Sequence, residues 1–242
     1  MPFPLAHPAA VWPLRRYCPR RFSFPALVIG SLSPDAGYCF GNGIFSHSFF
    51  PGSFAFCLPV GLVMLAGFYA LRLPVVAILP ARLKQAFLPA CQRPAGSPFL
   101  IVLSLLIGAW THLFLDSLTH EDGWLVERLP FLQKSAPLIW RSGLKGYEAL
   151  YAGCTLFGVA WLAVCYWRWL EMAAGLPALT KPWVRRGFSF LFAFSILCAG
   201  MAGRGERRLI GGVPLGIITL LLVTAFLLGT ARPFITSPAN KY

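Results

Sequence analysis

Five long apolar runs constrain the fold of this 242-residue chain more than any other feature. They extend over residues 54–71, 99–116, 149–166, 188–203 and 209–230. Most of them approach the roughly 20 residues that a helix needs to cross a hydrocarbon core of ~30 Å. Helices are favoured in lipid because they satisfy their own backbone hydrogen bonds. The sequence therefore predicts an all-α polytopic membrane bundle of about five transmembrane helices, organised as a single integral membrane domain over residues 1–242.

Composition supports the membrane and argues against a soluble nucleic-acid-binding protein. Hydrophobic residues make up 57% of the chain and charged residues only 12%, whereas a soluble domain has about 25% charged residues. The net charge of +13 would form a patch on a soluble face in a nucleic-acid binder. Here the basic residues bracket the apolar runs, as membrane-flanking anchors do. We therefore expect the lipid bilayer as a partner, and no nucleic acid.

The first 53 residues differ from the rest, with eight prolines and a basic cluster of Arg15, Arg16, Arg20 and Arg21. The apolar stretch 24–33 is too short to span, which predicts a re-entrant or interfacial segment. A cleaved signal peptide is the rival interpretation, and cleavage would remove His7. The segment lacks an A-x-A-like cleavage site and its basic residues begin late, so we expect it to be retained.

The four histidines lie in short polar islands within this apolar sequence. The densest island holds His112, Asp116 and His120, which recur at i, i+4 and i+8 at the end of the second apolar run. On a helix this spacing places all three side chains on one face. Ionisable groups in a membrane segment are costly unless they are paired, ligated or functional. The island is therefore the predicted centre of the chemistry.

Counting the spans predicts that all four histidines meet at one membrane face. His47 precedes the first span, and the island containing His112 lies at the far end of the second. If consecutive spans run antiparallel, these two points share a face. The N-terminal segment, with His7 and Asp35, lies on that face too unless the short apolar stretch crosses the membrane. We therefore expect these groups to converge at one interfacial level.

Histidine and aspartate side chains are ligands for zinc and similar divalent ions. In an unbroken helix His112 and His120 would lie ~12 Å apart along the axis and could not share one ion. Asp116 between them could bridge two ions, an arrangement that suits phosphoester hydrolysis. We expect Asp116 and His120 to be catalytic. The predicted metal ligands are His7, Asp35, His47, His112, Asp116 and His120.

Several segments resemble the bacterial membrane family called domain of unknown function 4184. They are the opening residues 1–14 with His7-Pro8, residues 25–35 ending in Ser33-Pro34-Asp35, His47-Ser48, and residues 108–120 with the HxxxDxxxH order. The resemblance also takes in Gly123-Trp124 and the later Trp167-Arg168-Trp169, and so covers most of the chain. It implies a helical integral membrane protein of the bacterial cytoplasmic (inner) membrane.

A fainter likeness is to membrane-bound metal-dependent hydrolases and, through them, to zinc-dependent phospholipase C. That enzyme family also orders an early histidine, a Pro-Asp, a histidine and an HxxxD. The likeness implies that the same six residues are ligands. No histidine follows His120, so the later HxxxE of that family is missing. One or two ions is therefore the most that the likeness implies.

The leading hypothesis is an integral membrane metal-dependent hydrolase that acts on a phosphoester or lipid-like substrate at the membrane face. The alternative is a non-enzymatic membrane protein whose His/Asp cluster is structural or binds metal without catalysis. A proton- or ion-coupled transporter would need ionisable residues in mid-span. The cluster lies at span ends instead, which makes transport the least favoured class.

Overall fold

The computed structural model describes residues 4–39, 43–134 and 145–174, and these residues form helices and no β-strand. The predicted all-α class is therefore confirmed for the described part of the chain. Three helices in this part are long and apolar enough to cross a membrane: Phe50–Ala77, Pro98–Thr119 and Gly146–Ala173. They correspond to the first three predicted spans. The predicted spans over 188–203 and 209–230 lie outside the described residues.

The first long helix is continuous through three segments: α5 (Phe50–Gly52), the π-helical turn η3 (Ser53–Cys57) and α6 (Leu58–Ala77). It begins before the predicted run and extends beyond it, through Pro74. Large apolar side chains on it remain exposed, including Val63 at 73% and Leu71 at 62%. Exposed apolar helix surface of this extent is typical of contact with lipid. After a short turn, α7 (Ala81–Cys91) packs back against α6.

The other two long helices are α8 (Pro98–Thr119) and α11 (Gly146–Ala174). Two short helices, α9 (Trp124–Arg128) and α10 (Pro130–Gln133), follow α8. They are tied to the start of α11 by a small core of Val126, Leu132 and Tyr147. Farther along, α11 exposes Phe157 at 68% and Met172 at 81%. It therefore presents an apolar surface, as α6 does.

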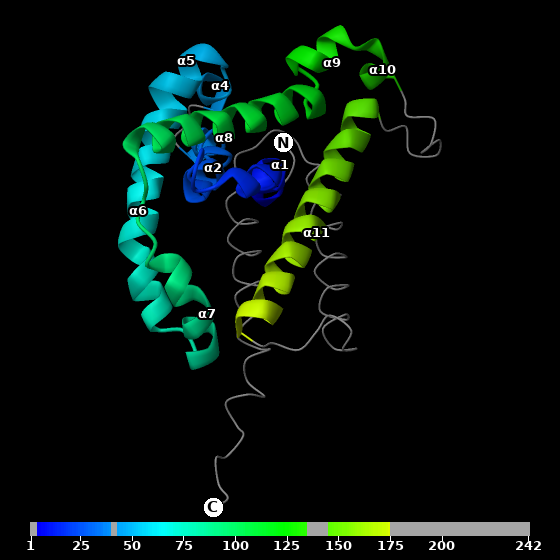
Figure 1. Ribbon diagram of the computed structural model, residues 1–242. Coiled ribbons are helices and arrows are strands. Elements are labelled where there is room, and N and C mark those ends of the chain that lie inside the picture. The colour runs from blue at the N-terminus through cyan, green and yellow to red at the C-terminus, as the bar shows by residue number, and fades with distance from the viewer. Residues whose placement is uncertain (1–3, 40–42, 135–144, 175–242) are drawn as a thin grey trace, which may run out of the picture.

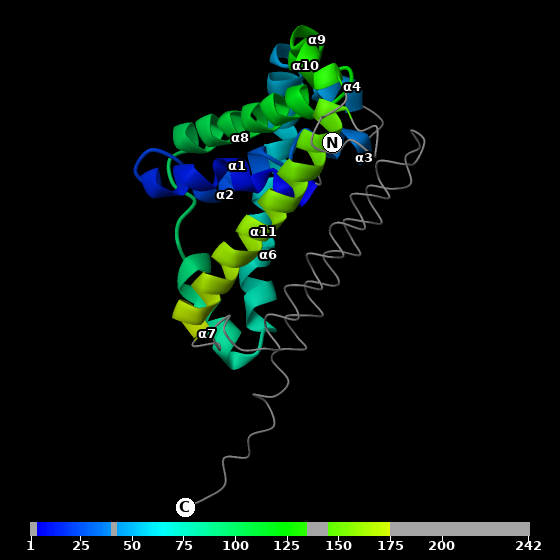
Figure 2. The ribbon, with the colours of Figure 1, turned by 90° about the vertical axis from the view of Figure 1, so that its right-hand side faces the viewer.

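Helix α8 lies across the upper ends of α6 and α11 in both Figure 1 and Figure 2. The predicted antiparallel arrangement of the first two spans is therefore wrong. The physical reason is that α8 has a partner that span counting does not consider. It is the most buried of the three long helices: 39% of its apolar segment is buried, compared with 17% and 11% in the other two. Much of that burial comes from the N-terminal segment.

The N-terminal segment folds as a series of short helices beside α8 (Figure 2). Its elements are η1 (Pro4–Ala6), α1 (Pro8–Val11), η2 (Trp12–Tyr17), α2 (Phe24–Gly30), α3 (Ala36–Cys39) and α4 (Gly43–Ser46). The frequent prolines explain the short lengths, because proline lacks the N–H that a continuing helix needs. The stretch predicted to be too short to span forms α2, and Ala26 packs with Leu65 and Leu105 in a shared core.

Two glycines allow α2 and α8 to pack backbone against backbone. A Cβ atom on Gly30 would overlap the Leu105 carbonyl oxygen, and one on Gly108 would overlap the carbonyl oxygen of Leu27. Small residues permit such close approach between membrane helices. The contact fixes the end of α2 against the middle of α8, one turn before His112.

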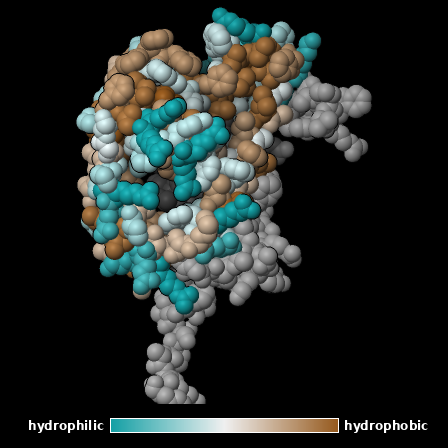
Figure 3. Space-filling model, in the orientation of Figure 1, coloured by the Kyte–Doolittle hydropathy of each residue, from teal (hydrophilic) through white to brown (hydrophobic). Residues whose placement is uncertain are grey.

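Apolar and hydrophilic side chains occupy different areas of the face in Figure 3. Apolar groups cover much of it, and hydrophilic side chains gather in its middle. Together with the three apolar helices, this distribution supports a membrane protein.

Candidate metal centre

Asp116 lies at the centre of a cluster of imidazoles. Its Oδ1 atom is 3.3 Å from Nε2 of His7, and its Oδ2 atom is 3.3 Å from Nε2 of His47 and 3.1 Å from Nε2 of His112. His7 caps α1, His47 follows α4, and the other two residues lie one turn apart on α8. Residues separated by more than 100 positions therefore meet at one point.

Asp35 supplies a second carboxylate near the same Nε2 atom of His112. Its Oδ1 atom is 3.6 Å from Nε2 of His112, and its Oδ2 atom is 4.0 Å from Nδ1 of His7. The residue lies in the turn between α2 and α3. Burial raises the pKa of the Asp35 carboxyl to about 6, against the opposing effect of the His112 imidazole. A buried carboxylate of this kind is stabilised by a nearby cation.

His120 joins the cluster because α8 ends just before it. The helix finishes at Thr119, and His120 has an extended backbone with φ −110° and ψ 147°. Its Nδ1 atom lies 3.0 Å from the backbone oxygen of Asp116 and 3.8 Å from the Oδ1 atom of that residue. Burial lowers the pKa of His120, which favours the neutral imidazole that metals bind. The predicted separation of ~12 Å between His112 and His120 assumed an unbroken helix, whereas α8 ends before His120.

All four imidazoles are held through Nδ1, which directs the Nε2 atoms of His7, His47 and His112 toward Asp116. The Nδ1 partners are the Pro4 carbonyl oxygen for His7 (3.3 Å), the Ser31 carbonyl oxygen for His112 (2.7 Å), the Asp116 carbonyl oxygen for His120 (3.0 Å) and the Ser46 hydroxyl for His47 (3.0 Å). A carbonyl oxygen only accepts, so Nδ1 is the donor in three of these bonds. In a neutral ring with Nδ1 protonated, Nε2 carries a lone pair. Metal-binding histidines are commonly oriented in this way.

The arrangement of the His7 and His112 rings favours a cation between the imidazoles and carboxylates. The two rings stack with centroids 3.7 Å apart and planes 18° from parallel, and both side chains are fully buried. The Nε2 atoms of the two rings lie 3.3 Å and 3.1 Å from oxygens of the Asp116 carboxylate. A divalent cation could be coordinated among these nitrogen and oxygen atoms.

Buried polar atoms within the described residues are consistent with such a cation. Both carboxylate oxygens of Asp35, Nε2 of His112 and Oδ2 of Asp116 are buried without a hydrogen-bond partner among these residues. Unsatisfied buried polar atoms are costly and usually have an explanation such as a bound ion. The donor set of imidazole nitrogens and carboxylate oxygens suits zinc and similar divalent ions. The residues present therefore fit a metal.

Two groups of three residues could each hold one ion, with potential ligand atoms within 4.8 Å of one another. One group is His7, Asp35 and His112, and the other is His47, His112 and Asp116. Because the Nδ1 atom of His112 donates to Ser31, only its Nε2 atom is available. That atom can bind one ion at a time, so the two groups cannot both be filled as they stand. Two ions would fit only if Asp116 bridged them and replaced His112 as a ligand of one ion.

Tyr38 is a residue at this site that the sequence did not indicate. Its ring lies 5.0 Å from the His47 ring, centroid to centroid, and the residue is 43% exposed. Burial, together with the charges of Asp116 and Asp35, raises the pKa of Tyr38 to about 12. Its hydroxyl is therefore a hydrogen-bond donor at neutral pH. The only sequence signal was its place one helical turn after Asp35.

The profile of one protein family, described as a domain of unknown function (DUF4184), matches residues 1–232. The chain belongs to the DUF4184 family. The match spans the whole N-terminal segment, all four histidines and every described helix of this DUF4184 chain. No curated protein and no solved structure matches the chain.

Proposed function

We propose that this DUF4184 chain is a membrane-bound metal-dependent hydrolase that acts on a phosphoester or lipid-like substrate at one membrane face. The orientation of the imidazoles carries the proposal. Three Nε2 atoms lie 3.1–3.3 Å from one carboxylate, and each ring is held from behind through its Nδ1 atom. Such preorganisation is expected of a metal site and is costly to build for packing alone.

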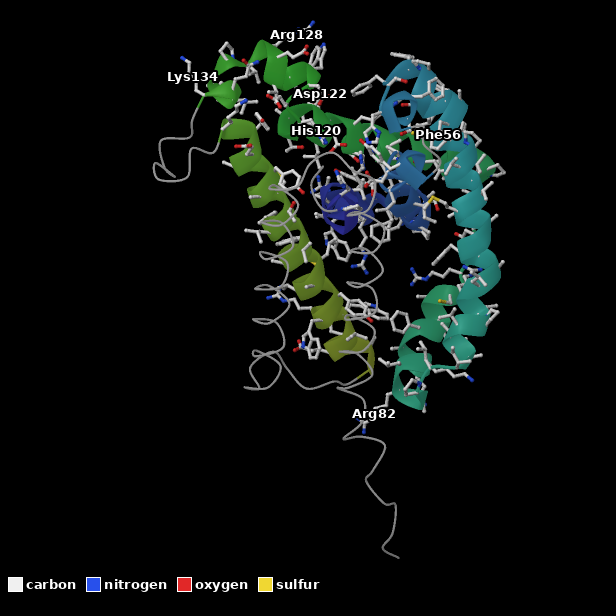
Figure 4. The ribbon with its side chains drawn as sticks, turned by 180° about the vertical axis from the view of Figure 1, so that it is seen from behind. Phe56, Arg82, His120, Asp122, Arg128 and Lys134 are labelled. Atoms are coloured by element: carbon white, nitrogen blue, oxygen red, sulfur yellow. The ribbon has the colours of Figure 1, made fainter. Side chains whose placement is uncertain are left out.

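Two histidines of the cluster are fully buried and two are partly exposed. The side chains of His7 and His112 are 0% exposed, whereas those of His47 and His120 are 17% and 25% exposed. Figure 4 places His120 at the end of the molecule that also carries Asp122 and Arg128. A hydrolytic metal site needs an open coordination position, whereas a structural zinc site is closed by four protein ligands. The accessible side next to His47 and His120 suits the open position.

A divalent ion, with zinc favoured by the donor types, would polarise a phosphoryl oxygen and acidify water. The role of Asp116 is to hold negative charge between the three Nε2 atoms, and Asp35 adds a second charge beside His112. His120, with its lowered pKa, is the accessible neutral imidazole that can accept a proton at the rim of the site. Tyr38 offers an O–H donor to a phosphoryl oxygen on the same side.

The test measures metal content and turnover in the same preparations. The full chain, purified in detergent without chelators, should carry one or two equivalents of zinc or a related ion, and should hydrolyse members of a panel of aryl and short-chain lipid phosphoesters. His47→Ala and His120→Ala should lower turnover by about 100-fold or more while the fold stays assembled. Glu127→Gln is the matched control, because Glu127 is an exposed carboxylate on α9, away from the cluster. It should leave both metal content and turnover unchanged.

A structural role is the alternative that one observation favours. The stack of His7 on His112 joins the N-terminal segment to α8, as a purely structural contact would. If the cluster has only this structural role, its variants should lose thermal stability in detergent and the parent chain should hydrolyse no phosphoester. A folded, metal-loaded but inactive parent would assign the site to metal binding without catalysis.

A further inference from the structure

The basic cluster on the N-terminal segment is held in place by aromatic rings. The guanidinium of Arg15 lies 5.0 Å from the centre of the Trp12 ring and 5.9 Å from that of Phe24. The Trp12 and Phe24 rings meet edge to face, with centroids 5.6 Å apart. The guanidinium of Arg16 lies 4.8 Å from the centre of the Tyr17 ring. Stacking on aromatic faces restricts an arginine while leaving its N–H donors available.

Within the described residues, none of the four arginines of this cluster forms an ion pair with a carboxylate. Their side chains are exposed. The sequence explains the lack of partners, because Asp35 is the only acidic residue before position 116, and it belongs to the metal centre. The cluster is therefore an uncompensated positive surface.

A shallow hollow, largely open to solvent, lies within this surface and is lined by Trp12, Pro13, Arg15 and Arg16. Figure 3 shows hydrophilic side chains gathering in the middle of one face, between apolar areas. The backbone N–H of Ser23 donates to the Ser104 hydroxyl at 2.9 Å, which fastens the end of the basic segment to α8. The hollow therefore sits on a supported part of the fold.

We propose that this hollow binds the phosphate group of an anionic phospholipid. Arginine's planar fork of donors matches phosphate oxygens. The Trp12 ring, which lines the hollow, is of the amphipathic type found at membrane interfaces. A lipid headgroup and a free phosphate share this chemistry. In a membrane protein the headgroup is the source present at high local concentration. The site is independent of the proposed hydrolysis, because it needs neither the metal nor the histidine cluster.

The test measures retention of dihexanoyl phosphatidylglycerol by the detergent-purified full chain, with dihexanoyl phosphatidylcholine for comparison. The parent should retain the anionic lipid preferentially. The double variant Arg15→Gln/Arg16→Gln should weaken retention by about 30-fold, because the phosphate loses the charge-assisted hydrogen bonds of two guanidinium groups. The matched control is Arg20→Gln/Arg21→Gln, which removes the same charge from exposed residues outside the hollow. It should change retention by less than about threefold.

Inorganic phosphate distinguishes the two sources of the anion. If millimolar phosphate fails to displace the lipid, the headgroup is the ligand. If phosphate displaces it and binds with the same dependence on Arg15 and Arg16, the hollow binds the free anion and the lipid assignment is overturned. Equal retention of the two lipids, or equal loss in both double variants, overturns the site itself. Unchanged thermal stability of the variants excludes unfolding as the cause of any loss.

Discussion

His47 differs from the other three histidines in what orients its ring. Carbonyl oxygens of the backbone accept from the Nδ1 atoms of the other three, so no side-chain substitution removes those bonds. His47 is oriented by the Ser46 hydroxyl, 3.0 Å from its Nδ1 atom. Ser46 is itself buried, and its backbone oxygen accepts from the Cys57 thiol at 3.3 Å. Ser46 is therefore a place where the orientation of a ring can be changed without removing a ligand.

Replacing Ser46 with alanine should weaken metal affinity by about 10- to 100-fold without abolishing binding, as loss of an orienting partner typically does. The measurement is a titration of the metal-loaded full chain with a competing chelator. Ser48→Ala serves as the control, because Ser48 bonds to Phe45 and Gly52 rather than to a histidine. Equal affinities in all three proteins would show that Ser46 does not orient a ligand.

At the scale of elements, the contact between α2 and α8 positions the site. Gly30 and Gly108 bring the two backbones together, and the chain leaves α2 at Ser31, whose carbonyl oxygen accepts from His112. The same turn leads to Asp35. The metal centre is therefore assembled where one short helix ends against a long one.

The substitution Gly108→Ala should push α2 away from α8 and destabilise the chain by about 1–3 kcal/mol, the usual cost of overpacking. Metal content should fall with it, because Ser31 and Asp35 move away from His112. Thermal unfolding in detergent and metal analysis would measure both effects. Gly67→Ala is the control, since a Cβ atom on Gly67 of α6 would meet no atom within 4 Å. A stable, metal-loaded Gly108→Ala protein would be incompatible with the close backbone contact.

At the scale of the whole molecule, the metal centre lies toward one end of the long helices. Figure 1 shows α8 across the upper ends of α6 and α11, with α7 at the lower end. Figure 4 places Lys134 and His120 near one end and Arg82 of α7 near the other. If α6 and α11 cross the bilayer, these two ends lie on opposite sides of the membrane.

Cysteine labelling would test this arrangement in a variant whose native cysteines are replaced. Lys134→Cys and Lys84→Cys introduce exposed thiols on α10's C-cap and on α7. An impermeant maleimide should label one of them in intact cells and the other only after permeabilisation. Labelling of both from the same side would mean that α6 and α11 do not span the membrane together.

The sequence by itself determined the helical class and the residues of the cluster, because both depend on local chemistry. Apolar runs long enough for a bilayer can satisfy their backbone only as helices. Histidines and aspartates in such a sequence are too costly to be incidental. The six residues predicted as ligands form one cluster, because the four histidines lie beside Asp116 and Asp35 lies beside His7 and His112. Their role as ligands remains a prediction.

Only the tertiary structure decided how these residues meet. Span counting predicted convergence through antiparallel helices, whereas α8 crosses α6 and the N-terminal segment brings His7 and Asp35 to it. The partners that orient the rings also escaped prediction, because three are backbone carbonyls that carry no residue identity. The place of Tyr38 beside His47 and the hollow beside Arg15 also depend on contacts in the folded chain. Contacts between distant segments depend on close packing, and no local pattern in the sequence records which backbones approach each other.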